Sequence, residues 1–300
     1  MREVPNPTLA DEFEALISAG EHNENALQAF IERHTAFLPT PSLLNHQLHL
    51  QSLISKFPIG DRKTDFAYLT KSSDRWKLVL VELESPAKPL FKASSNSANS
   101  AEFNDAVAQI VTWKEHWQDL RGEVERRLRP LLVPPSMAGN TISVEFQMVI
   151  GRAAEKAHDD ARRRRLATIH ESGIHVMTWD TLLDNYRAGR GEPKAVLTVN
   201  SNGYKLKHVE RMPELMFAYV RPQHLKLSKE ADKALRADGY AIDAWKGGAL
   251  LEVNGKWPMG NIEEAVEEMA DERMRSFLTS VGKQVAKKRG ERSRRKKAAE

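Results

Sequence analysis

Residues 76–84 read Trp-Lys-Leu-Val-Leu-Val-Glu-Leu-Glu, and this stretch decides the fold. Its residues 78–81 are apolar at every position, a pattern typical of a strand covered on both faces. Because side chains alternate along a strand, Glu82 and Glu84 are expected on the same face as Trp76. Carboxylates at the end of the apolar face of a central strand are costly unless a partner or a cation neutralises them.

A second strand is expected at residues 64–69, joined to the first by the polar turn at 71–74. Antiparallel pairing of the two strands would bring Asp65 alongside Glu82 and Glu84. Three converging carboxylates suit a hard divalent cation such as Mg²⁺ or Mn²⁺, which can polarise a phosphate and generate a hydroxide nucleophile.

A salt-bridge cluster explains the same acids equally well. In that interpretation Arg62, Lys63 or Lys88 neutralises them at the end of the strand. The spacing alone leaves both interpretations open.

The surrounding pattern predicts an α/β fold with a mixed central sheet flanked by helices, in a domain of residues 1–190 that opens with N-terminal helices. The expected helices are 9–19, 24–38, 103–117, 153–170 and one from 180, and the further strands are 142–150 and 174–179. Residues 43–57 form another apolar stretch.

A smaller C-terminal α+β unit is expected at residues 193–282, after the sequence Gly-Arg-Gly-Glu-Pro at 189–193. Its predicted elements are short strands within 196–207, a hairpin over 245–256 that closes on Asn-Gly, and a helix over 261–278. Residues 283–300 form a basic tail that we expect to be disordered.

The charge of the chain is uneven. Residues 283–300 carry nine Lys or Arg and two acids, a net charge of +7, whereas the rest of the chain has a net charge of −3. The basic character therefore belongs to the tail and does not make the body a nucleic-acid binder. The chain has no cysteine, which excludes disulfides and thiol catalysis. No stretch resembles a signal peptide or a membrane span, so we expect a cytoplasmic protein with no membrane partner.

Several segments resemble the nuclease domain of the Shedu antiphage-defence family. They are Thr-Asp-Phe at 64–66, LVELESPAKPLF at 80–91 and AQIVTW at 108–113, supported by flanking segments at 30–38, 150–152 and 176–183. The resemblance covers roughly residues 20–187. It implies a restriction-endonuclease-like core of the PD-(D/E)xK type.

Carried over to this chain, the resemblance makes Asp65 and Glu82 the metal ligands, with Mg²⁺ or Mn²⁺ as the cofactor. Glu84 stands where the family motif has lysine. It could bind metal or act as a general base, Lys88 could supply the positive charge instead, or activity could be lost. Gln109 matches a glutamine that positions water or phosphate, although a glutamine at a helix edge also bonds to backbone or solvent.

The resemblance implies a metal-dependent DNA endonuclease, a hydrolase acting on phosphodiester bonds in antiviral defence, which binds DNA and assembles as a homo-oligomer. The alternative is an inactive module that keeps the nuclease fold for DNA binding or regulation. A third interpretation is a structural or interaction protein. The unit at 193–282 would sense, gate or assemble the nuclease. No glycine-rich phosphate loop is present, so no nucleotide cofactor is expected.

Other candidates are weaker. Glu24 lies on the inward stripe of its helix, but a glutamate after an N-cap is favourable wherever it points. His46 and His49, three apart on an expected helix, lack further ligands for a metal site. The arginines at 162–165 could contact phosphates, but Asp159 and Asp160 give them ordinary helix partners.

Overall fold

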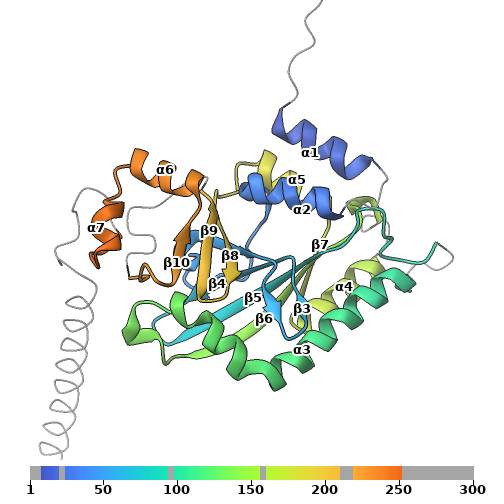
Figure 1. Cartoon of the computed structure of the whole chain (residues 1–300). Coiled ribbons are helices and arrows are strands. Elements are labelled where there is room, and N and C mark those ends of the chain that lie inside the picture. The colour runs from blue at the N-terminus through green and yellow to red at the C-terminus, as the bar shows by residue number, and fades with distance from the viewer. Residues whose placement is uncertain (1–7, 20–23, 94–97, 156–159, 210–218, 252–300) are drawn as a thin grey trace, which may run out of the picture.

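The computed structural model describes residues 8–19, 24–93, 98–155, 160–209 and 219–251 (Figure 1). The predicted α/β class with a mixed sheet is confirmed. The helices are α1 (Leu9–Ser18), α2 (Glu24–Arg33), α3 (Ala101–Leu128), α4 (Asp160–Glu171), α5 (Trp179–Arg187), α6 (Lys229–Ala237) and α7 (Ile242–Lys246). The strands are β1 (Ser52–Ser55), β2 (Pro58–Ile59), β3 (Arg62–Lys63), β4 (Phe66–Lys71), β5 (Arg75–Leu83), β6 (Thr141–Val149), β7 (Ile174–Met177), β8 (Ala195–Asn200), β9 (Gly203–His208) and β10 (Leu225–Leu227).

One large sheet has the strand order β10-β9-β8-β1-β4-β5-β6-β7, and β2 and β3 form a small separate ribbon. Helices α1, α2 and α5 cover one face, and α3 and α4 cover the other (Figure 1). Residues 78–81 of β5 are fully buried, as the apolar run predicts. Their side chains divide between the two faces, because Leu78 and Leu80 join the core under α3 while Val79 and Val81 join the core under α1 and α2.

The predicted antiparallel pairing of β4 with β5 is confirmed, with Phe66 opposite Val81. Asp65 immediately precedes β4, so this register places it next to the end of β5 that carries Glu82. On its other edge β5 pairs parallel with β6. The hairpin therefore determines where the acids meet.

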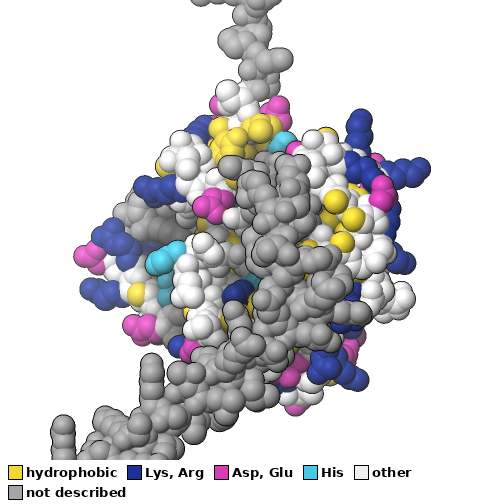
Figure 2. All heavy atoms as spheres, turned by 90° about the vertical axis from the view of Figure 1, so that its left-hand side faces the viewer, with side chains coloured by type: hydrophobic (Ala, Val, Ile, Leu, Met, Phe, Trp, Pro, Cys, Tyr) yellow, Lys and Arg dark blue, Asp and Glu magenta, His cyan; other side chains and the backbone are white. Residues whose placement is uncertain are grey.

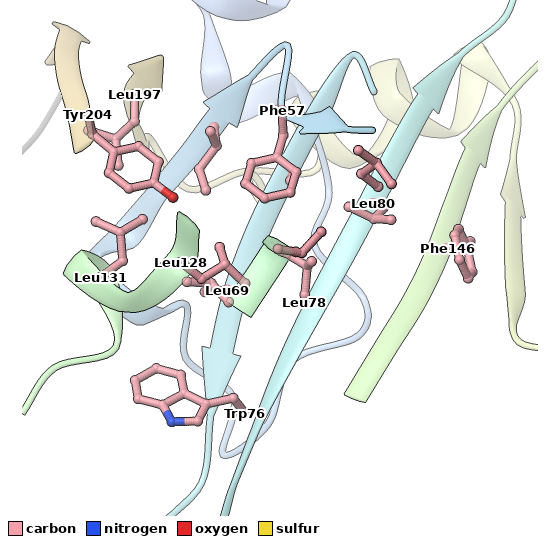
Figure 3. Close-up of a cluster of buried hydrophobic side chains, with 14 of the residues drawn as sticks. Phe57, Leu69, Trp76, Leu78, Leu80, Leu128, Leu131, Phe146, Leu197 and Tyr204 are labelled. Atoms are coloured by element: carbon pink, nitrogen blue, oxygen red, sulfur yellow. The ribbon is translucent and has the colours of Figure 1, made fainter. Parts of the chain in front are cut away.

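The strands beyond residue 193 extend the same sheet. β8 pairs parallel with β1, with Leu53 opposite Val196, and β9 and β10 follow outward. Figure 3 shows Leu197 of β8 and Tyr204 of β9 in the same buried cluster as Leu69 of β4 and Leu128 of α3. The boundary near residue 190 stays a prediction, but no separate sheet lies beyond it in the described residues.

Two predicted elements are wrong. The region of His46 and His49 is not a regular helix: His49 starts a single 3₁₀ turn, and the four-residue strand β1 follows directly. Trp245, expected in a hairpin, lies in α7, where its indole Nε1 donates to the carbonyl of Val220 at 2.9 Å. This tertiary contact outweighs the local turn preference.

The predicted helix at 261–278, the Asn-Gly turn at 254–255 and the basic tail at 283–300 lie outside the described residues. Among the residues that are described, no helix combines the length and the apolar character needed to cross a membrane.

Candidate functional site

Asp65 is fastened where β4 and β5 meet. Its Oδ2 accepts a hydrogen bond from the backbone N–H of Leu83 at 2.8 Å, and its Oδ1 accepts one from Lys56 Nζ at 2.7 Å. The side chain is only 15% exposed. Asp65 is thus held beside the end of β5 by one backbone contact and one ion pair.

Glu82 points from β5 toward α3, where Gln109 Nε2 donates to its Oε1 at 2.6 Å. Its other oxygen, Oε2, is buried and has no hydrogen-bond partner within the described residues. Burial, together with the nearby charges of Asp65 and Glu84, raises the pKa of Glu82 to about 9, although the hydrogen bond from Gln109 and the charge of Lys56 lower it. A buried carboxyl oxygen that lacks a hydrogen-bond partner and lies among like charges lowers the stability of the folded chain.

Glu84 lies just beyond the last residue of β5, and its backbone N–H continues the β5–β6 pairing through a 2.8 Å bond to the carbonyl of Val149. Its side chain is buried and pairs with Lys88, whose Nζ also lies 3.6 Å from Oε1 of Glu24. Burial raises the pKa of Glu84 despite that lysine. The structure therefore places Lys88 between two glutamates, and Glu24 at the margin of the same cluster.

Gln109 contacts the carboxylate cluster directly. Its amide donates to Glu82, and the role in positioning water or phosphate that the family resemblance implies stays a prediction. Gln109 therefore fixes the rotamer of Glu82.

Two neighbours of Asp65 were not predicted. Lys56 follows β1 with a left-handed backbone (φ 50°) and pairs with the Asp65 carboxylate. Gln28 of α2 is buried, and its Nε2 lies 3.5 Å from the carbonyl oxygen of Asp65. The inward position of Gln28 beside Leu27 could have indicated its role. Nothing in the local sequence marks Lys56, because its position depends on β1 pairing with β4.

The acids of this site fit a hard divalent cation by their chemistry. Glu82 Oε2 is a buried carboxyl oxygen without a hydrogen-bond partner in the described residues, and a cation there would favour the ionised form of Glu82 and offset the charges of Asp65 and Glu84. As the side chains stand, no group of three or more His, Asp or Glu is positioned to hold a metal within the described residues. Both oxygens of Asp65 are instead taken by Lys56 and Leu83.

The other sequence candidates lie elsewhere. His49 is buried in the core, its Nε2 is 2.8 Å from the carbonyl oxygen of Leu131, and burial lowers its pKa to about 3. Arg162 covers the ring of Phe91, and Arg163 pairs with Asp160 on its own helix. These contacts are structural.

Fold and site together define an α/β protein whose central mixed sheet carries a carboxylate cluster, Asp65, Glu82 and Glu84, at one end of its β4–β5 hairpin. The family model described as "Shedu protein SduA, C-terminal" matches residues 21–183, more than half of the chain. The chain therefore belongs to the Shedu family, which associates it with antiphage defence. A comparison with curated proteins finds no match.

Proposed function

We propose that this chain is a metal-dependent DNA endonuclease that acts in antiphage defence. The observation that carries the proposal is Glu82, a buried carboxylate with an unpartnered oxygen, held by Gln109 and surrounded by two further acids. Titratable groups with strongly shifted pKa values concentrate at catalytic sites. Such groups do not stabilise the fold, so their presence indicates a role in function.

In this proposal Asp65 and Glu82 hold Mg²⁺ or Mn²⁺. The ion, when bound, polarises the phosphate and lowers the pKa of an attacking water. Gln109 keeps Glu82 in the rotamer that its 2.6 Å hydrogen bond defines. Lys88 offsets the charge of Glu84, so that this glutamate can remain close to Glu82.

A groove beside the carboxylates suits the backbone of a DNA strand. It has a volume of about 400 Å³, and its lining includes three lysines, Lys56, Lys63 and Lys207, together with one acid, Glu32, which pairs with Lys207. Lys56 belongs to both the groove and the site, because it also pairs with Asp65. Lysines along a groove bind phosphates without reading sequence, and such binding weakens as salt rises.

The test is cleavage of linear, supercoiled and phage DNA with Mg²⁺ or Mn²⁺. Glu82→Gln keeps the shape and removes the charge, and we expect it to lower the cleavage rate at least about 100-fold. The matched control is Glu145→Gln, which changes a partly buried glutamate on the neighbouring strand β6 and should alter the rate by less than about threefold. Metal-dependent cutting that survives Glu82→Gln unchanged would remove the assigned site.

A non-catalytic DNA-binding or regulatory module is the second candidate. The observation that favours it is Glu84, which occupies the place of the motif lysine and is already paired with Lys88. DNA binding by the wild-type chain without cleavage of any substrate, in either metal, would support this candidate. Glu84→Lys separates a working site from a decayed one, because loss of an existing activity shows that Glu84 contributes to it.

A further inference from the structure

A second polar cavity lies at the far end of α3. It has a volume of about 710 Å³ and is bounded by the end of α3, the segment that follows it, the β8–β9 turn and the segment before β10. We call it the arginine pocket, after the basic residues in its lining, Arg126, Arg127, Arg129, Arg221 and His224.

Positive charge is in surplus in the arginine pocket. Its lining contains one acid, Glu123, whose Oε1 accepts from Arg127 at 3.0 Å. The Nε of Arg127 is buried and has no hydrogen-bond partner in the part of the chain that the structure describes. Arg129 and Arg221 are exposed and form no ion pair with a described residue. Figure 2, which views the side of the molecule where α6 and α7 lie, shows Lys and Arg side chains interspersed with Asp and Glu side chains around the edge of that face.

The rest of the lining is of a different kind. Leu132, Val133 and the prolines 130 and 135 supply apolar surface, and Tyr219 supplies an aromatic ring. Asn200 and Asn202 of the β8–β9 turn add amide groups. A ligand that matches this lining carries both anionic groups and a flat, largely apolar ring with polar edges.

The arginine pocket is built on anchored elements. The hydroxyl of Tyr204 on β9 donates to the carbonyl of Arg127 at 3.0 Å, which ties the end of α3 to the sheet. Val220 is fully buried, and its carbonyl accepts from Trp245 Nε1. A Cβ at Gly203 would lie 2.4 Å from the carbonyl oxygen of His224, so the β8–β9 turn meets that segment closely. Fixed walls lower the entropic cost of binding.

We propose that the arginine pocket binds a nucleoside phosphate, either free or as part of a nucleic-acid strand. Guanidinium groups bind phosphate oxygens in a bidentate manner, and the apolar wall with Tyr219 suits a base. The volume falls within the ~300–1,000 Å³ typical of small-molecule sites. The absence of a glycine-rich loop does not oppose this, because arginine side chains supply the phosphate contacts here.

This pocket is distinct from the carboxylate cluster. Gln109 and Arg127 lie on the same helix, α3, and 18 residues of helix separate them by roughly 27 Å. One nucleotide cannot reach both. The proposal therefore does not depend on the proposed nuclease activity.

The test measures the binding of two probes to the full chain by calorimetry or fluorescence. The probes are ATP and a 5′-phosphorylated single-stranded oligonucleotide, and EDTA is present throughout. We expect binding of at least one probe, weakened about tenfold or more by the double variant Arg129→Ala/Arg221→Ala. Both side chains are exposed, so the fold should persist, and a thermal melt checks this. Arg164→Ala, which removes an exposed arginine from α4, is the matched control and should bind within twofold of wild type.

The probes also separate the two sources of the ligand. Tighter binding of the oligonucleotide than of ATP assigns the pocket to a nucleic-acid strand, and equal or tighter binding of ATP assigns it to a free nucleotide. Two results would overturn the proposal: no binding of either probe by the wild-type chain, or equal binding by the wild type and the double variant. Because EDTA excludes metal-dependent cleavage, neither result depends on whether the chain is a nuclease.

Discussion

Glu82 on β5 and Glu145 on β6 are partly buried glutamates on adjacent strands, and their surroundings shift their pKa values in opposite directions. Burial would raise the pKa of Glu145, but Lys77 Nζ lies 2.6 Å from its carboxylate, His175 Nε2 lies 3.5 Å away, and together with other contacts they lower that pKa. Glu82 forms no ion pair with a described residue, and its pKa is raised to about 9.

The difference lies in the partners of the two glutamates. A glutamate that contributes to folding stability is expected to have a cation beside it, as Glu145 has. Glu82 instead has two more acids nearby, and one of its oxygens has no hydrogen-bond partner in the described residues. Salt bridges with Lys77, Lys56 and Lys88 neutralise Glu145, Asp65 and Glu84, whereas no described cation pairs with Glu82.

Removing Lys77, the ion-pair partner of Glu145, should leave Glu145 without a paired lysine, as Glu82 is, and we expect it to change stability more than the other substitutions below. Lys77→Met leaves Glu145 without its closest cation, and we expect the free energy of unfolding at pH 8 to fall by about 3 kcal/mol. Urea denaturation measures it. The double variant Lys77→Met/Glu145→Leu should recover most of the loss. A loss of only about 0.5 kcal/mol would place the pair among ordinary surface ion pairs.

Removing the charge of Glu82 should stabilise the protein. The folded-state pKa of about 9 lies above the ordinary value of 4.5, so the folded chain binds this proton more tightly than the unfolded chain does. The contribution of Glu82 is therefore fully present below pH ~4.5 and is lost as the pH rises through about 9. In EDTA at pH 9, Glu82→Gln should exceed the wild type in unfolding free energy by roughly 2 kcal/mol.

Glu145→Gln is the matched control, with the opposite sign. Because the pKa of Glu145 is lowered, its stabilising contribution is present above its unfolded pKa and is lost as the pH falls through its folded pKa. This variant should be less stable than the wild type at pH 8 and approach it in acid. Equal signs for the two variants at pH 8–9 would contradict the comparison.

Mg²⁺ should stabilise the chain through Glu82 and not through Glu145. Adding about 10 mM Mg²⁺ should raise the unfolding free energy of the wild type and of Glu145→Gln by about 1 kcal/mol, if the ion binds with millimolar affinity. Glu82→Gln should show no such gain. A thermal melt with and without EDTA makes the measurement, and an equal gain in Glu82→Gln would place the metal at another site.

The smallest expected effect comes from Gln109. Gln109→Leu removes the hydrogen bond to Glu82 Oε1, which favours the charged form, so the pKa of Glu82 should rise further. We expect a loss of about 1 kcal/mol at pH 9. Gln118→Leu, at an exposed position on the same helix, is the control and should change stability by less than about 0.5 kcal/mol. A larger loss in the control would mean that helix effects dominate.

The centre of the fold could be predicted because its signals are local. The apolar run at residues 78–81 indicates a strand buried on both faces, and the polar turn before this strand indicates the hairpin with β4. β1 could not be recognised, because four buried residues inside a longer apolar stretch carry no period that separates strand from helix. The helix at Trp245 was missed because its indole is held by Val220, far away in sequence.

The site was predictable to the same extent. The register of one hairpin brings Asp65 to the end of β5, and Glu82, Glu84 and Gln109 were predicted from the resemblance of the surrounding sequence. The partners of these residues depend on elements that meet only in three dimensions. Lys56 reaches Asp65 because β1 pairs with β4. The arginine pocket likewise requires the end of α3 to meet the β8–β9 turn.

The position of β1 has a consequence for any attempt to isolate the family-matching segment. β1 hydrogen-bonds to β4 on one side and to β8 on the other, and all four of its residues are buried. A fragment that ends at residue 183, where the family match ends, would lack β8 and leave β1, which is buried in the full chain, as an unpaired edge strand. Exposed edge strands pair with other chains and promote aggregation. Residues 21–183 are therefore enough to identify the family, but we expect that a fragment must also include β8 to stay monodisperse.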